Sequence, residues 1–225
     1  VNATGGVDGS VFHYGNGSAV GAHKNITVEN CTFSNFKGDS WVRVNRGTVA
    51  DFDVSNVRIA NNNFSGGGTR DAAAGGVPSA AIYITGNEIT GGTSFLKDVI
   101  IENNFIDASN FKQGIQVISN SHTRINQKNI VIKNNTIRNA GQVSTVVYGY
   151  GISVYGYQSH VLITGNQVIN SYSSGIYSVF ATDVIISNNL VDGQSVDDNT
   201  GLARGGIALT ANSKFIIENN IVANC

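Results

Sequence analysis

The sequence predicts an all-β solenoid of about seven coils stacked in parallel, and three observations carry this prediction. An eight-residue pattern recurs along the chain, its apolar residues alternate with other residues, and most copies contain an asparagine at the same place. The copies read ITVENCTF, VRIANNNF, VIIENNFI, IVIKNNTI, VLITGNQV, VIISNNLV and FIIENNIV. Repeats of about 20–50 residues indicate units that bury their apolar faces only by stacking on one another.

The composition agrees with an all-β protein and excludes several functions. The chain has 225 residues, 27 of them Gly and 1 Pro, and its net charge is −1 with 13% charged residues. A near-neutral chain has little electrostatic attraction for nucleic acid or acidic lipid, and no apolar run is long enough to cross a membrane. We interpret residues 1–225 as a single domain. We also expect a fragment of a longer chain, because it opens at VNATGG without Met and closes inside the seventh copy.

The main strand of each unit has a period of two, as in Ile26/Val28, Val57/Ile59 and Val99/Ile101, which is typical of β-strands. The second aliphatic residues are Val28, Ile59, Ile101, Ile132, Ile163, Ile186 and Ile217, separated by 31, 42, 31, 31, 23 and 31 positions.

Two shorter strands accompany the main strand in each unit. One lies at 12–14, 42–44, 82–84, 115–117, 152–154, 176–178 and 207–209. The other lies around Phe33, Phe64, Ile106, Ile137, Val168, Val191 and Val222. A Gly precedes the first kind of strand from the fourth coil onward, at positions 114, 151, 175 and 206. We expect a sharp corner with positive φ there.

Asparagine stands three residues beyond the second aliphatic position in six of seven units, at Asn62, Asn104, Asn135, Asn166, Asn189 and Asn220. Cys31 takes this place in the first unit, where we expect a buried thiol. Asn tolerates the left-handed backbone of a tight corner, and its amide bonds to neighbouring main chain. Stacked corners therefore predict an Asn ladder that satisfies buried polar groups.

Over about residues 11–222 this pattern resembles the right-handed parallel β-helix of the pectate-lyase-like superfamily. That group includes polysaccharide lyases, glycoside hydrolases, C5-epimerases and phage tailspike depolymerases. The resemblance implies an extracellular protein (secreted, on a cell surface or on a virion) that binds and degrades a polysaccharide. The chain lacks the lyase, polygalacturonase and epimerase signature motifs, so no catalytic residue is transferred from them. A non-catalytic stalk or adhesin segment is the alternative.

Long connections point to one flank of the solenoid, because insertions in a solenoid form loops at its edges. The longest are 65–81, 138–151 and 192–206, next to the strands of the 82–84 type. The outward residues of those strands are His13, Arg43, Tyr83, Gln116, Ser153 and Tyr177. Aromatic rings stack on sugars, and amide and guanidinium groups bond to hydroxyls and carboxylates, which predicts a glycan groove.

Candidate catalytic residues follow from two chemistries. Elimination needs a base, for which Tyr83 or His122 is available, and cations near the uronate carboxylate, such as Arg43 or Arg70. Hydrolysis needs two carboxyls, and Asp71 in the longest insertion is the first candidate, followed by Asp39, Asp107, Asp197 and Asp198. The expected substrate-binding residues are Gln116, Lys112, Arg124, Tyr148, Tyr150, Tyr155 and Tyr177.

No metal site and no cofactor are expected, because the four His show no metal-binding spacing. The Asp-containing loops leave Ca²⁺ as an alternative, without the spacing of a calcium loop. The expected partner is a polysaccharide. The residues between the paired aliphatics point outward and form an apolar row, which predicts a homotrimer or a covering segment. This row consists of Ile100, Val131, Leu162, Ile185 and Ile216.

Overall fold

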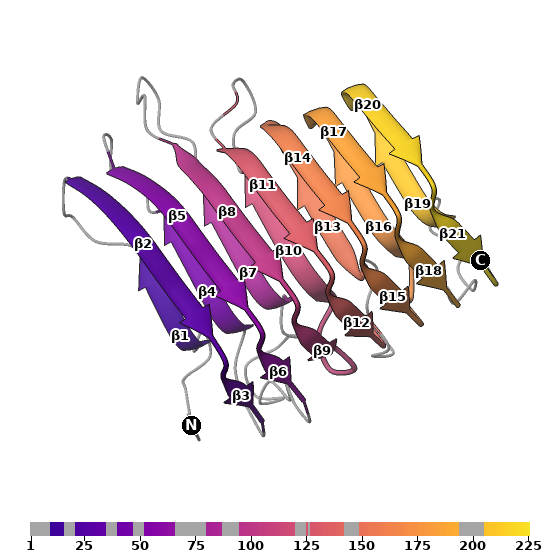
Figure 1. Ribbon diagram of the computed structural model, residues 1–225, viewed down its shortest axis with the longest axis horizontal. Helices are drawn as coiled ribbons and strands as arrows, with labels where there is room; N and C mark the ends of the chain where they lie inside the picture. The colour runs from indigo at the N-terminus through magenta and orange to yellow at the C-terminus, as the bar shows by residue number, and fades with distance from the viewer. Residues whose placement is uncertain are drawn as a thin grey trace, which may run out of the picture.

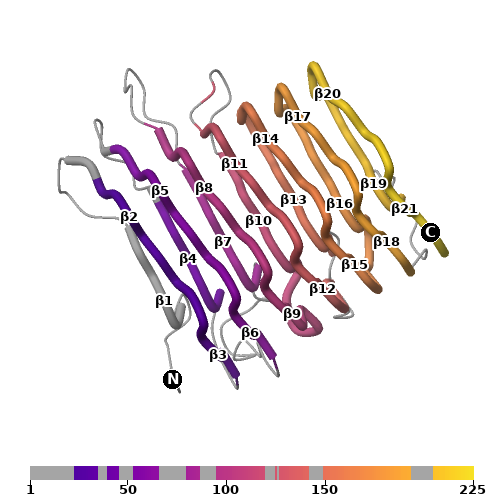
Figure 2. Tube along the Cα trace, viewed as in Figure 1, coloured from indigo at the N-terminus to yellow at the C-terminus, as the bar shows by residue number. Residues whose placement is uncertain are grey.

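The computed structural model describes residues 10–15, 21–34, 40–46, 52–65, 80–86, 95–119, 125, 127–141, 149–193 and 205–225 (Figure 2). All regular elements in these ranges are β-strands, as the alternating pattern predicts. They form three parallel sheets of seven strands each, and successive coils follow one another along the long axis from the N-terminal to the C-terminal end (Figure 1). The prediction of a seven-coil parallel solenoid is confirmed.

The first sheet contains β1 (Ser10–Gly15), β4 (Ser40–Arg46), β7 (Ala80–Gly86), β10 (Gln113–Ser119), β13 (Ile152–Tyr155), β16 (Ser174–Val179) and β19 (Gly205–Thr210). The second contains β2 (Gly21–Glu29), β5 (Phe52–Ala60), β8 (Leu96–Glu102), β11 (Gln127–Lys133), β14 (Gln158–Thr164), β17 (Thr182–Ser187) and β20 (Ser213–Glu218). The third contains the short strands β3 (Thr32–Phe33), β6 (Asn63–Phe64), β9 (Phe105–Asp107), β12 (Thr136–Arg138), β15 (Gln167–Ile169), β18 (Leu190–Asp192) and β21 (Ile221–Ala223).

The core is a column of aliphatic side chains from all three sheets. Ile59, Ile101 and Ile132 follow one another in register along the second sheet and are fully buried. Burying each such side chain contributes roughly 1.5–3 kcal/mol. Toward the N-terminal end aromatic rings fill the column: Phe33 and Phe64 stack with ring centroids 4.7 Å apart. The octet recurs because each copy places one layer in this column.

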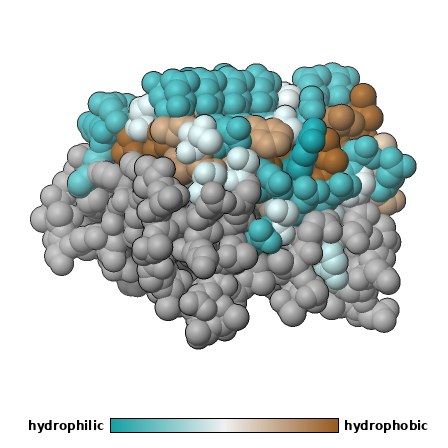
Figure 3. Space-filling view, turned by 90° about the horizontal axis from the view of Figure 1, so that it is seen from below, coloured by the Kyte–Doolittle hydropathy of each residue, from teal (hydrophilic) through white to brown (hydrophobic). Residues whose placement is uncertain are grey.

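The column is closed at the first coil and open at the last. Val28 in β2 is only 6% exposed, whereas Ile217, its counterpart in β20, is 46% exposed. Ile186, one coil earlier, is fully buried because the β20 coil covers it. Figure 3 shows hydrophobic surface at this C-terminal end, on the right.

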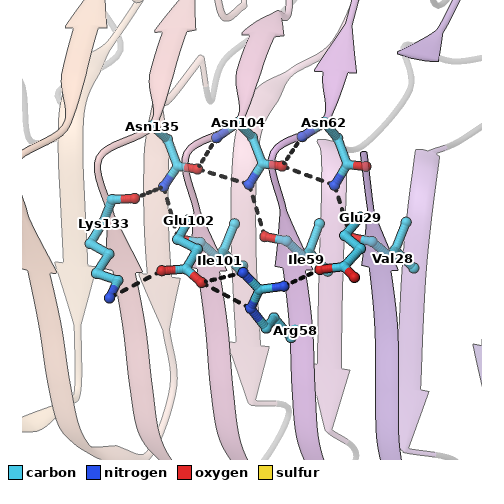
Figure 4. Close-up of polar contacts among 10 residues, drawn as sticks. All are labelled: Val28, Glu29, Arg58, Ile59, Asn62, Ile101, Glu102, Asn104, Lys133 and Asn135. Carbon is cyan, nitrogen blue, oxygen red and sulfur yellow. Dashed lines mark hydrogen bonds and ion pairs between the residues drawn. The ribbon is translucent and has the colours of Figure 1, made fainter. Parts of the chain in front are cut away.

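The Asn ladder forms at the corner between the second and third sheets (Figure 4). The main-chain N–H and the side-chain Nδ2 of Asn62 both donate to Oδ1 of Asn104, each at 3.0 Å. Asn104 donates in the same two ways to Asn135, at 3.0 and 2.9 Å. A second hydrogen of each Nδ2 bonds to the main chain of the preceding coil, as from Asn104 to Ile59 O at 2.9 Å. The ladder continues through Asn166 and Asn189 to Asn220.

The two roles expected of one asparagine are divided between neighbours. The residue with left-handed backbone is the one before the ladder residue, as in Asn103 (φ 54°) and Asn134 (φ 55°). Asn104 and Asn135, which form the ladder, are not among the residues of positive φ. The first Asn therefore turns the chain, and the second satisfies the buried polar groups.

Two local expectations are wrong. Gly114 and Gly151 do not have positive φ. A Cβ at Gly114 would lie 2.4 Å from Ile137 Cγ2 and 2.7 Å from Gly151 O, so close packing requires Gly there. Cys31 is exposed rather than buried, because it occupies the first rung of the ladder and has a neighbour on one side only.

A chain of charges crosses the outer surface of the second sheet (Figure 4). Arg58 on β5 bonds to Glu29 on β2 and, through Nε at 2.9 Å, to Glu102 on β8. Lys133 Nζ on β11 lies 3.0 Å from the other oxygen of Glu102. The hydrogen bond from Lys133 is the main cause that lowers the pKa of Glu102; partial burial opposes this effect, and Arg58 adds to it.

Candidate functional site

The outward side chains of the first sheet form a row in strict register. Arg43 pairs with Tyr83, Tyr83 with Gln116, Gln116 with Ser153, and Ser153 with Tyr177. Parallel pairing keeps such residues on one face at about 4.8 Å per strand. The backbone of β1 extends the row to His13, whose side chain lies outside the described part of the structure. The row predicted from the period-two pattern is therefore present.

A pocket of about 380 Å³ opens over the middle of this row. Its lining consists of Tyr83, Lys112, Gln113, Gln116, Ile118, Tyr150, Ser153, Tyr155 and Tyr177. The volume falls in the range of about 300–1,000 Å³ that is usual for sites of small ligands. Strands β7, β10, β13 and β16 supply most of the lining, so the floor is part of the rigid solenoid.

Two lining residues come from the corners that lead into the first sheet. Lys112 lies in the short turn between β9 and β10, and Tyr150 lies two residues before the first residue of β13. The ring of Tyr150 stacks on that of Tyr177, with centroids 4.4 Å apart and planes at 22°. Tyr150 is only 4% exposed, so this pair is a fixed wall of the pocket. On the floor, the hydroxyl of Ser153 donates to Oε1 of Gln113.

Positive charge lies at one end of the pocket. The guanidinium of Arg43 lies 5.1 Å from the centroid of the Tyr83 ring, in a cation–π contact. Lys112 is the one cation among the described residues that line the pocket, whereas Arg43 reaches the pocket only through its contact with Tyr83. Among the described residues, no Asp or Glu lines the pocket. The described part of the site therefore offers aromatic rings, amides and cations, which suit a ligand with hydroxyl and anionic groups.

An aromatic group continues the surface beside the pocket. Tyr155, which is 37% exposed, meets the ring of Phe180 edge to face at 6.4 Å. Tyr157 stacks on the same Phe180 at 5.8 Å but does not line the pocket. The two tyrosines, two positions apart, therefore differ in their access to a ligand in the pocket.

The structure brings six of the candidate residues expected from sequence together in one pocket. Tyr83, Lys112, Gln116, Tyr150, Tyr155 and Tyr177 line one pocket, and Arg43 contacts it through Tyr83. Arg70, Asp71, His122, Arg124 and Tyr148 lie outside the described residues, as do Asp39, Asp197 and Asp198. This placement says where the side chains are; their catalytic and binding roles stay predictions.

Asp107 is the one carboxylate candidate within the described residues. It lies on β9 in the third sheet, where it accepts from the main-chain N–H of Ser109 at 3.2 Å and from Nδ2 of Asn139 at 3.3 Å. It is not part of the pocket lining. Its contacts are those of a corner-forming residue.

Gln113 and Ile118 belong to the lining but were not predicted from sequence. Ile118 is two residues beyond Gln116, so the period of two places it on the same face, in register with Tyr155. Gln113 is the first residue of β10, and its role depends on its contact with Ser153, 40 positions away, which no local pattern reveals.

A second exposed face lies on the second sheet. Ile100, Val131, Leu162, Ile185 and Ile216 follow one another in register, as the sequence predicts. Arg58 takes the corresponding place on β5 and ends the apolar row toward the N-terminus. The row lines two shallow pockets, each of about 470 Å³.

Searches for other kinds of site give two further findings. Within the described ranges, no three His, Cys, Asp or Glu side chains gather in a way that would hold a metal ion. In the same ranges, no helix has the length and apolar character needed to cross a membrane.

Comparison with protein families agrees with the fold. The family model described as "Right handed beta helix region" matches residues 2–191 and again residues 125–225. No curated protein matches the chain. The two matches together cover nearly all of the sequence, in keeping with the repeated octet and the three parallel sheets. The chain belongs to the right-handed β-helix family.

Proposed function

We propose that this β-helix binds an extended acidic polysaccharide along its first sheet, outside the cell, and cleaves it by elimination. The observation that carries the proposal is the gathering of four tyrosines in one pocket, at positions 83, 150, 155 and 177. Tyrosine rings present flat apolar faces to the C–H faces of sugars, and their hydroxyls bond to sugar hydroxyls. The in-register row runs along the solenoid axis and suits a linear polymer.

The charge of the pocket supports an acidic ligand. Arg43 and Lys112 are the charged side chains at and beside the described lining, and both are cations. Guanidinium and ammonium groups form strong charge-assisted hydrogen bonds with carboxylates. A polysaccharide that carries uronate carboxylates complements this arrangement better than a neutral one.

Among degradative reactions, elimination fits the described residues better than hydrolysis. In elimination a base removes the proton beside the uronate carboxylate, the C–O bond to the leaving sugar breaks, and a C=C bond forms. The leaving oxygen takes up a proton. Tyr83, in contact with Arg43, is the candidate base in its phenolate form, while Arg43 and Lys112 neutralise the carboxylate. Hydrolysis would require two carboxyls, which the described lining lacks.

Binding is tested by calorimetry against a panel of acidic and neutral glycans. We expect Tyr177→Ala to weaken binding about tenfold, which corresponds to a loss of about 1.4 kcal/mol. Tyr157→Ala is the matched control, because Tyr157 lies nearby but outside the pocket. Equal effects of the two substitutions would contradict a glycan site in the pocket.

Chemistry is tested on the same glycans after incubation. New absorbance near the ultraviolet edge indicates the double bond formed by elimination, and new reducing ends without it indicate hydrolysis. We expect Tyr83→Phe to abolish the absorbance change and to leave binding within about threefold of wild type. Binding without either product would favour a non-catalytic adhesin, and the absence of binding would favour a stalk.

A further inference from the structure

The corner between β16 and β17 carries an exposed phenylalanine (Figure 1). Phe180 is 42% exposed, although a further coil follows it along the solenoid. It contacts two tyrosines of the preceding coil, Tyr155 edge to face and Tyr157 by stacking. An aromatic side chain that is this exposed and yet held by two other rings is a candidate for contact with a ligand.

The backbone of Phe180 has the left-handed conformation, with φ of 57°. The residues at the same turn of the neighbouring coils are Gly156, with φ of 92°, and Ala211, with φ of 51°. A bulky side chain is rare in this conformation, and backbone strain of this kind gathers at functional sites. The fold therefore carries a strained aromatic residue at a turn where a small residue is sufficient.

The corner holds the ring of Phe180 in a fixed place. Its main-chain N–H donates to the carbonyl of Thr210 at 3.1 Å. The next residue, Ala181, donates its N–H to Oδ1 of Asn212 at 2.8 Å. Tyr157 packs against one face of the ring, with the two planes at 5°. A side chain that is fixed before binding loses little conformational entropy when a ligand arrives.

Tyr155 connects this corner with the pocket. It lines the pocket, is 37% exposed, and lies in register with Val179, the residue before Phe180. We call Tyr155 and Phe180 the corner platform. Lys112 precedes β10 and Phe180 follows β16, so the cation of the pocket and the corner platform lie toward opposite ends of parallel strands.

We propose that the corner platform is a second sugar-stacking subsite, which takes an uncharged sugar face of the same glycan whose acidic unit lies near Lys112. This inference rests on the proposed function. Aromatic rings stack on the C–H faces of sugars without needing a charge, whereas the ammonium group of Lys112 favours a carboxylate. The site therefore selects chains long enough to reach from the pocket to the corner over single acidic sugars.

Calorimetry with two lengths of one glycan tests the proposal. The ligands are a disaccharide and an octasaccharide prepared from the acidic polysaccharide that binds best in the panel above. We expect Phe180→Ala to weaken octasaccharide binding about tenfold and to change disaccharide binding less than twofold. Ala211 has the same left-handed backbone, so alanine fits this turn. Tyr177→Ala, in the pocket wall, is expected to weaken binding of both lengths alike.

Three further variants separate a ligand contact from a packing role. Phe105→Ala is the matched control, because Phe105 is 37% exposed but lies on the third sheet, and it should affect neither length. Phe180→Tyr keeps an aromatic ring and should stay within about threefold of wild type at both lengths. Phe180→Asn supplies a residue that tolerates left-handed backbone, so the urea midpoint should not fall while octasaccharide binding weakens.

The outcomes distinguish failure of the second subsite from failure of the proposed function. Unchanged octasaccharide binding in Phe180→Ala overturns the subsite, while weaker disaccharide binding in Tyr177→Ala still supports the pocket. A wild type with equal affinity for the two lengths also overturns the subsite. A lower urea midpoint in Phe180→Asn together with weaker binding of both lengths overturns it too, because Phe180 would then act through packing. The absence of binding to either length overturns the proposed function and this inference together.

Discussion

Asn104 and Asn135, 31 positions apart, are joined by two hydrogen bonds that end on one oxygen: the main-chain N–H and Nδ2 of Asn104 both donate to Oδ1 of Asn135. Asn135 in turn donates to the carbonyls of Ile101 and Lys133, and to Oδ1 of Asn166. One buried amide therefore satisfies polar groups in three coils. Each of these groups would cost about 1–3 kcal/mol if left buried without a partner.

Asn135→Ala is therefore expected to destabilise the protein by about 3 kcal/mol or more, measured by urea unfolding. Asn134→Gly is the control at the neighbouring position. Asn134 is exposed and has left-handed backbone, which Gly adopts without strain, so a change within about 0.5 kcal/mol is expected. Equal losses in the two variants would contradict the division of roles between the paired asparagines.

Glu102 makes the stability of the second sheet depend on pH. Its pKa is lowered in the folded protein, chiefly by the hydrogen bond from Lys133, from an ordinary value of 4.5. A carboxyl with a lowered folded pKa stabilises the fold fully above its unfolded pKa, and the stabilisation disappears as pH falls through the folded pKa.

Lys133→Gln removes the hydrogen bond that is the main cause of the lowered pKa of Glu102. We expect it to cost at most about 1 kcal/mol at neutral pH, because Lys133 is partly exposed. The stability difference between wild type and variant should begin to shrink near pH 4.5 and vanish at lower pH. Urea unfolding from pH 7 to pH 2 measures it. A difference that stays constant across this range would show that Lys133 acts through packing and not through the charge of Glu102.

The parts of the fold predicted from sequence depend on local periodicity. The alternation in Val99/Ile101 predicts the main strand of a coil, and the spacing of the ladder asparagines predicts where each coil begins again. Both signals are visible in the sequence because every coil must supply the same inward residues. The left-handed residue inside each main strand was not predicted, although Asn129 and His160 share it with φ of 57° and 55°. Its occupants also include Asp98 and Lys214, so no single residue type signals it.

The residues of the candidate site also fall into those that a local sequence pattern predicts and those that depend on contacts between coils. Tyr83, Gln116 and Tyr177 were placed on one face because a strand alternates its side chains, which is a local rule. The contact of Gln113 with Ser153 and the stacking of Tyr150 on Tyr177 depend on how separate coils come together. The reason for Gly114 is similar, because the atoms that exclude a Cβ belong to Ile137 and Gly151.

Gly114→Ala is expected to destabilise the fold by about 1–3 kcal/mol, because the new methyl group would overlap Ile137 Cγ2 and Gly151 O. Ile137→Ala removes one of these two obstacles and costs about 2–5 kcal/mol by itself. The double variant should then lose less stability than the two single variants added together. Thermal and urea unfolding of all three measure the coupling, and strict additivity would show that Ile137 is not the obstacle.

Lys112 is expected to determine the preference for acidic glycans. Lys112→Gln keeps a polar side chain of similar length but removes the charge from the pocket lining. Binding of an acidic glycan should weaken about tenfold at low salt, and binding of a neutral glycan should change less than twofold. Because salt screens the attraction of exposed charges, the difference in affinity for the acidic glycan between wild type and Lys112→Gln should narrow as ionic strength rises.

Lys97→Gln on β8 makes the same change in net charge on another sheet and should leave binding unaffected. If Lys97→Gln matched Lys112→Gln at every salt concentration, the effect would come from overall charge and the pocket would not be the site of recognition.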